Sequence, residues 1–224
     1  MLFRSGISVV AERQRYVVTP GLPRCDELRV EPDASSLSYL LAAAAISGTT
    51  VEASGIGAGS LQADAGFVRV LADMGCAVTV APDCIALRGA PLAGIDLDLG
   101  AMPDVVLTLA AIAPFAQGPV RMRNIAHLRG KESDRIDAAA HALTALGVRC
   151  RQEADELHVE SGSTRAARIA TRGDHRMAMA FAVTGLLLPG IEVDDAACVQ
   201  KSFPGYWREL ARFRAHHALA SAGS

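Results

Sequence analysis

The segment from Arg172 to Ala180 concentrates the chemically active residue types of this sequence. A glycine, an acid, an imidazole and a guanidinium follow one another there as Gly173, Asp174, His175 and Arg176, directly before an apolar helical run. Charged side chains and free backbone N–H groups at a helix N-terminus bind anions. The segment therefore predicts an anion-binding helix start.

Two further segments place charged side chains where a helix is expected to begin, Met102–Asp104 and Lys131–Arg135. Three such starts in one chain predict a single anionic site assembled from parallel helices. Each residue also has an ordinary interpretation. Asp104 after Pro103 would serve as a helix N-cap, and Glu132 would compensate a helix dipole. The cations are typical partners of surface salt bridges.

The basic residues carry a second signal. The chain has 22 Lys plus Arg, yet Lys131 and Lys201 are its two lysines. Because arginine is used almost everywhere else, these lysines are expected to be needed as compact ammonium groups, and both fall at motif starts. The alternative is a pair of solvated surface lysines.

The composition bounds the class of protein. The 224 residues are 50% hydrophobic and 21% charged, with a net charge of −2, which is ordinary for a globular chain. This balance argues against nucleic acid or an acidic membrane as the main partner. The sequence holds no apolar run of membrane-spanning length. The 5 cysteines form no C-x-x-C pair, so they predict buried thiols in a reducing cytoplasm and neither a metal site nor a cofactor.

One unit of sequence occurs three times: an apolar Ala/Leu-rich helix, a glycine and then a strand. The glycines that end these helices recur roughly every 70 residues, too long for a typical solenoid, so we expect a compact three-fold arrangement. The helices are apolar on nearly all sides and should lie in the interior. The predicted helices are Ser36–Ile46, Asp104–Ala116 and His175–Leu188, and the strands are Thr49–Ala53, Pro119–Arg123 and Ile191–Val193.

A second, amphipathic helix follows in each copy and should pack nearer the outside. A strand pair comes after the second helix in the first two copies, whereas the third copy has none. The predicted helices are Leu61–Met74, Ser133–Leu146 and Pro204–Arg214, and the strand pairs are Ala77–Val80 with Ile85–Leu87 and Val148–Arg151 with Leu157–Val159. The fold class predicted is thus α/β, with three repeated α/β units, buried parallel helices and outer sheets.

Residues 1–31 do not fit the repeat. Ile7–Ala11 and Arg15–Thr19 predict a hairpin, and Leu28–Glu31 predicts a strand leading into the first copy. We expect 1–31 to be the remnant of another domain, 32–215 to be the repeated domain, and the Ala-rich end, 216–224, to be a flexible tail.

With these motifs placed, the sequence resembles the carboxy-terminal half of the 3-phosphoshikimate 1-carboxyvinyltransferases, or EPSP synthases. The resemblance covers nearly the whole chain and rests on an ordered series of segments. These are Asp33–Ser36, Met102–Asp104, Arg123–Ile125, Lys131–Arg135, Gly173–Met179 and Lys201–Pro204. It implies one domain of a two-domain enolpyruvyl transferase fold that closes on its substrates. Since family enzymes are longer, it also implies a missing amino-terminal domain, so this is either a fragment or a chain whose partner supplies the rest.

The resemblance implies a cytoplasmic enzyme that transfers the enolpyruvyl group of phosphoenolpyruvate to the 5-hydroxyl of shikimate 3-phosphate and releases phosphate. Two carboxyl groups beside cations can share the proton transfers that this reaction needs. By the resemblance, Asp104 and Glu132 are catalytic; Arg135, Arg176 and Lys201 bind phosphoenolpyruvate; Asp104, Lys131 and His127 bind shikimate 3-phosphate; and His175 and Asp174 support the site.

Two other functions stay open at this point. One is that of the sister enolpyruvyl transferase, which acts on UDP-N-acetylglucosamine and shares the fold. The other is a non-catalytic module that binds anions with the same repeat. The retained carboxylates Asp104 and Glu132 argue against the second, because simple anion binding does not need them.

Overall fold

The computed structural model of the chain describes residues 6–13, 15–22 and 24–222. The chain divides into two compact units, with the boundary after Pro32. Each unit is described by itself. That the first unit is the remnant of another domain stays a prediction.

The first unit contains an antiparallel hairpin of β1 (Val9–Glu12) and β2 (Arg15–Val18), as the sequence predicts. Both strands are largely exposed, including Tyr16 at 73%. The strand predicted at Leu28–Glu31 is wrong: these residues run outside any sheet. A local sequence pattern cannot provide the neighbouring strand that a β-ladder requires.

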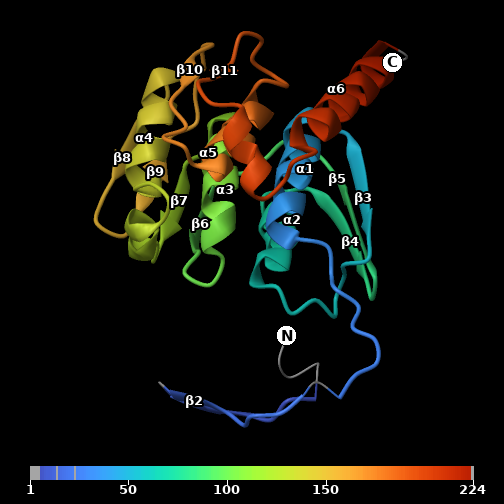
Figure 1. Cartoon of the computed structure of the whole chain (residues 1–224). Helices are drawn as coiled ribbons and strands as arrows, with labels where there is room; N and C mark the ends of the chain where they lie inside the picture. The colour runs from blue at the N-terminus through green and yellow to red at the C-terminus, as the bar shows by residue number, and fades with distance from the viewer. Residues whose placement is uncertain (1–5, 14, 23, 223–224) are drawn as a thin grey trace. The chain divides into compact units, whose positions relative to one another are not determined.

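Three first helices fill the interior of the second unit and pack against one another (Figure 1). The amino-terminal halves of α1 and α3 are in contact, since Ser38 Oγ lies 3.0 Å from Thr108 Oγ1. Gly48 ends α1 in the left-handed conformation, at φ 71°. The helices are α1 (Ala34–Ser47), α3 (Val106–Ile112, entered through the 3₁₀ turn η3, Pro103–Val105, and followed by η4, Ala113–Phe115) and α5 (His175–Thr184).

The second helices are each entered through a 3₁₀ turn. They are α2 (Phe67–Asp73, after η2, Ala63–Gly66), α4 (Arg135–Ala145, after η5, Ala126–Gly130) and α6 (Tyr206–Ala222, after η6, Ala197–Lys201). The last helix continues beyond the predicted end at Arg214, because the alanines and leucine that follow favour helix. Within the described part of the chain, the helices are too short or too polar to cross a membrane.

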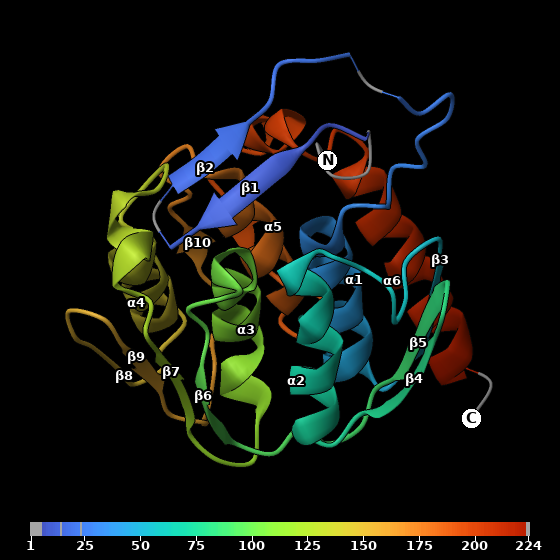
Figure 2. The same ribbon diagram turned by 90° about the horizontal axis from the view of Figure 1, so that it is seen from below.

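The sheets flank the helices: β3, β4 and β5 lie on one side and β6 to β9 on the other (Figures 1 and 2). The first sheet has the strand order β3-β5-β4 and is antiparallel throughout. The second has the order β6-β7-β9-β8, in which β6 runs parallel to β7 and the other pairs are antiparallel. Strands β10 and β11 form a two-stranded parallel sheet. The strands are β3 (Thr50–Ser54), β4 (Ala77–Ala81), β5 (Cys84–Arg88), β6 (Ile95–Asp98), β7 (Val120–Arg123), β8 (Cys150–Gln152), β9 (Leu157–Val159), β10 (Arg168–Ile169) and β11 (Glu192–Val193).

The sequence pattern misses β6 and β10. Each is short and pairs in parallel with a strand on the far side of a whole helix, β7 and β11 respectively. Such a partner is fixed by tertiary packing and leaves little trace in the local sequence. Both missed strands lead into the helices whose starts carry the charged motifs, so they help to position those starts.

Candidate active site

Arg135 is the centre of a charged network. It is the first residue of α4, and it is only 1% exposed. Its Nε donates to Asp174 Oδ2 at 2.8 Å and its Nη1 to Asp104 Oδ1 at 2.9 Å. Its Nη2 donates to Glu132 Oε2 at 2.8 Å. One guanidinium therefore ties together the starts of α3, α4 and α5.

Arg176 extends the network toward α1. Its Nη2 donates to Asp104 Oδ2 at 3.0 Å, and its Nη1 lies 3.4 Å from the hydroxyl of Tyr39. Tyr39 is fully buried, and this burial raises its pKa, so the phenol stays protonated. Tyr39 was not predicted. Its signal is a phenol in an Ala/Leu-rich interior helix, because a buried hydroxyl usually has a polar partner.

Lys201, at the end of η6, joins the network through Glu132. Its Nζ lies 2.7 Å from Glu132 Oε1. This contact is the main reason that the pKa of Glu132 falls to about 2. The lysine side chain is 58% exposed, in contrast to the buried Arg135. The network thus runs from the buried interior to the surface.

The predicted residues converge. Asp104, Glu132, Arg135, Arg176 and Lys201 come from four separate stretches of sequence and form one connected set of ion pairs. Together with the buried carboxylate of Asp174, three cations meet three carboxylates. Each cation is neutralised by the protein's own acids in this state.

Asp174 and His175 are the buried residues at the start of α5. Asp174 is 0% exposed and accepts from the backbone N–H of Arg176 at 2.9 Å, so it caps α5. His175 is 3% exposed, and its Nδ1 finds no hydrogen-bond partner among the described residues. Burial, followed by the charge of Arg176, lowers the pKa of His175, which keeps the imidazole neutral. Asp174 is thus the N-cap of α5, while the supporting role of His175 stays a prediction.

Lys131 and His127 are exposed and lie in or next to η5, outside the buried network. Their turn is held by Arg129, whose Nη1 donates to Asp134 Oδ2 at 2.8 Å. Asp134 is itself the N-cap of α4 and accepts from the backbone N–H of Asp137. Lys131 and His127 are therefore exposed on a turn that is fixed to the start of α4.

Residues 1–210 match the family model described as EPSP synthase (3-phosphoshikimate 1-carboxyvinyltransferase). This chain belongs to the EPSP synthase family. The predicted fold class, three repeated α/β units of the enolpyruvyl transferase fold, is confirmed as well.

Curated relatives of this EPSP synthase family member carry the name 3-phosphoshikimate 1-carboxyvinyltransferase. The Nostoc punctiforme protein is 47% identical over 179 residues, which is 80% of this chain and 42% of the relative. The Syntrophobacter fumaroxidans protein is 42% identical over 219 residues, covering 96% and 52%. The chain therefore spans about half the length of the curated relatives it matches.

Solved structures agree on the fold. An EPSP synthase from Acinetobacter baumannii superposes with a TM-score of 0.82 at 26% identity, covering 94% of this chain and 52% of that protein. The enolpyruvyl transferase NikO from Streptomyces tendae has a TM-score of 0.67 at 19% identity, covering 95% and 51%. The second likeness concerns the fold alone.

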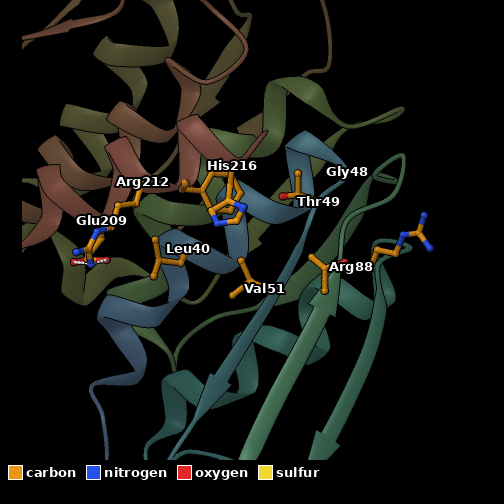
Figure 3. A pocket seen from close by; sticks show the side chains of 10 residues that line it. Leu40, Gly48, Thr49, Val51, Arg88, Glu209, Arg212 and His216 are labelled. Atoms are coloured by element: carbon orange, nitrogen blue, oxygen red, sulfur yellow. Dashed lines mark hydrogen bonds and ion pairs between the residues drawn. The ribbon is translucent and has the colours of Figure 1, made fainter. Parts of the chain in front are cut away.

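Other features of this EPSP synthase family chain lie away from the charged network. A groove of about 690 Å³ lies between α1, β3 and α6, and its lining includes Leu40, Val51, Arg212 and Phe213 (Figure 3). It contains none of the predicted site residues. Across the described ranges, no cluster of His, Cys, Asp or Glu is arranged to hold a metal ion.

Proposed function

We propose that this chain supplies the carboxy-terminal half of an EPSP synthase active site. The reaction moves the enolpyruvyl group of phosphoenolpyruvate onto the 5-hydroxyl of shikimate 3-phosphate and releases phosphate. The observation that carries the proposal is the interlocked set of three cations and three carboxylates at the helix starts, in a chain that matches the family over residues 1–210.

The cations are proposed to bind phosphoenolpyruvate. Arg135, Arg176 and Lys201 are paired with Asp104 and Glu132. An incoming phosphate and carboxylate compete for these cations, and guanidinium groups suit both because they donate two parallel hydrogen bonds. Binding would therefore exchange ion pairs within the protein for ion pairs with the substrate.

That exchange supports a role for Glu132 in moving protons. A carboxyl group with a pKa of about 2 is ionised and has no proton to deliver at neutral pH. When an anionic substrate takes over Lys201, the main cause of this low pKa is removed. The pKa of Glu132 then rises, and the group can exchange a proton with the methylene carbon of phosphoenolpyruvate.

Asp104 is proposed to accept the proton of the attacking hydroxyl. Its two oxygens lie 2.9 Å from Arg135 Nη1 and 3.0 Å from Arg176 Nη2, which fixes the plane of the carboxylate. Lys131 and His127 are proposed to bind shikimate 3-phosphate, supported by their exposure beside Glu132. Asp174 and His175 would hold the helix start in place.

The rest of the active site is proposed to come from an amino-terminal domain. Two strands alone are marginally stable, and β1 and β2 expose apolar residues such as Val10 and Tyr16. The third repeat likewise has only the pair β10 and β11 within the described residues, and an open groove lined by Trp207 and Leu210 lies beside it. These exposed surfaces support the proposal of a further, amino-terminal domain. The free thiols fit a cytoplasmic enzyme.

The test is phosphate release from phosphoenolpyruvate and shikimate 3-phosphate. We expect no turnover from the 224-residue chain alone, because an open half-site leaves its cations solvated and the reacting atoms unaligned. Adding the amino-terminal domain of a relative, such as the Nostoc punctiforme protein, should restore turnover, and Asp104→Asn or Glu132→Gln should abolish it. Failure of every such combination to release phosphate would contradict the proposed reaction.

The two alternative functions are separated by ligand binding to the same assembled protein. Stabilisation by shikimate 3-phosphate with phosphoenolpyruvate, and not by UDP-N-acetylglucosamine, supports the proposal. Stabilisation by the UDP-sugar supports the sister reaction. Equal stabilisation by inorganic phosphate alone, without turnover, would indicate an anion-binding module.

A further inference from the structure

The loop that leads into α5 has an unusual backbone. Arg172 has a φ of 55° and Gly173 a φ of 70°, so two successive residues adopt the left-handed conformation. Glycine does this freely, whereas a residue with a side chain loses free energy there. Arg172 therefore occupies a position where glycine would fit more easily, and such strain persists only where neighbouring contacts enforce it.

Two contacts hold the loop. Arg172 Nη1 donates to Asp137 Oδ2 at 2.7 Å, and Asp137 lies in the first turn of α4. Thr171 donates its backbone N–H and its hydroxyl to Asp194 Oδ1, at 2.8 and 2.6 Å. Gln152 of β8 donates to the other oxygen of Asp137 at 3.0 Å. The loop is thus pinned to α4 on one side and to the end of β11 on the other.

The loop ends at Asp174, which belongs to the charged network, so the contacts of the loop also affect the position of that carboxylate. Arg135, in the first turn of α4, is paired with Asp174 in the loop, and Arg172, in the loop, is paired with Asp137 in the same turn of α4. The two ion pairs run in opposite directions between the same two segments. The pair of Arg135 with Asp174 is buried, and the pair of Arg172 with Asp137 is partly exposed.

We propose that Arg172 is a positioning residue that, through its pair with Asp137, holds Asp174 and hence Arg135 and Arg176 in place. This inference rests on the proposed function for its role in substrate binding, but the geometry is independent of it. The competing explanation is an ordinary surface ion pair, which contributes little. If the pair of Arg172 with Asp137 were ordinary, its removal would leave the position of Asp174 unchanged.

The direct test is amide hydrogen exchange on the 224-residue chain. The backbone N–H of Arg176 donates to Asp174 Oδ1 and so reports on the position of that carboxylate. Arg172→Ala and Asp137→Asn should each raise its exchange rate at least about fivefold, beyond any change in global stability. The control is Arg149→Ala, which removes the exposed pair of Arg149 with Glu160 and should leave the rate unchanged.

Two more variants separate the ion pair from the backbone. Arg172→Gly suits the left-handed conformation but cannot pair with Asp137, so it should exchange as fast as Arg172→Ala. The double variant Arg172→Asp with Asp137→Arg restores a pair with reversed charges and should recover at least half of the lost protection. Unchanged protection in Arg172→Gly, or no recovery in the double variant, would overturn the inference.

Phosphoenolpyruvate binding provides the second readout, by calorimetry on the chain assembled with an amino-terminal domain. Arg172→Ala should raise the Kd for phosphoenolpyruvate about three- to tenfold, and the charge-reversed double variant should recover part of it. If the parent assembly binds no phosphoenolpyruvate, the proposed function fails, while the exchange data still decide the role of Arg172. A parent that binds, together with an Arg172→Ala variant of equal affinity and unchanged exchange, would show an ordinary surface pair.

Discussion

Lys131 and Arg135 lie in one short segment, yet the fold treats them differently. Arg135 is 1% exposed and is bonded to three carboxylates, whereas Lys131 is exposed at the edge of the same network. A buried charge must be fully compensated by the protein, while an exposed one is solvated by water. One short segment therefore contains a cation that the protein's own carboxylates hold in the interior and a cation that water solvates.

The largest expected effect is on the buried side. Arg135→Ala leaves the buried carboxylate of Asp174 without its main partner, and we expect the free energy of unfolding to fall by about 3–5 kcal/mol. Urea denaturation of the chain measures it. The exposed pair provides the control, because Arg149→Ala should change stability by no more than about 0.5 kcal/mol. Equal losses in the two variants would remove the distinction between buried and exposed cations.

The second prediction tests the exposed side. Lys131→Ala should leave the free energy of unfolding within about 0.5 kcal/mol of the parent, because the side chain is solvated. In the assembled enzyme, its affinity for shikimate 3-phosphate should fall roughly 10- to 100-fold, as expected for the loss of a charge-assisted hydrogen bond. Calorimetric titration measures the affinity. A variant that loses stability but keeps affinity would reverse the assignment.

The third prediction uses pH to probe the buried side. The pKa of His175 is lowered in the folded state, so the unfolded chain binds a proton first as the pH falls. Its contribution to stability is full above the usual value of 6.5 and is lost as the pH falls from there toward the folded pKa, by up to about 1.4 kcal/mol per pH unit. His175→Gln should therefore flatten the loss of stability below about pH 6.5. An unchanged slope would mean that His175 is not buried as a neutral group.

The smallest expected effect on stability concerns the pair of Lys201 with Glu132, which joins the exposed residues to the buried ones. Lys201→Met removes the main cause of the low pKa of Glu132, so this pKa should rise from about 2 toward its usual 4.5. Glu132 contributes stability above pH 4.5 that is lost as the pH falls toward 2, and the variant should show less of this acid-side loss. Carboxyl carbon chemical shifts follow the titration. Stability at neutral pH should change by no more than about 1 kcal/mol, because Lys201 is 58% exposed.

Much of this arrangement could be predicted from residue patterns. The apolar runs located the interior helices, and Gly48 ends α1 as predicted, whereas α5 ends at Thr184, before the predicted end at Leu188. Asp33, Asp134 and Asp174 cap their helices, as expected for aspartate before a helix. Asp104, Glu132, Arg135 and Arg176 were named from charged motifs at helix starts, and Lys201 from the scarcity of lysine in this chain. Tyr39 was missed, because its role depends on Arg176, which is far away in the sequence.

The limits of sequence reasoning are equally specific. A strand was predicted at Leu28–Glu31, where the described chain joins no sheet, and β6 and β10 were missed. In each case the deciding factor is the presence or absence of a neighbouring strand. Backbone hydrogen bonds in a sheet are made between distant segments, so the segment's own residues do not determine them.

By itself the sequence determined which residues carry charge, where helices start and stop, and that one unit repeats three times, because these properties depend on side-chain type and local spacing. Only the tertiary structure decided that Arg135 is buried against three carboxylates while Lys131 stays in water. The reason is that burial and ion pairing depend on which segments meet in space, and here three helix starts from distant parts of the chain meet at one guanidinium.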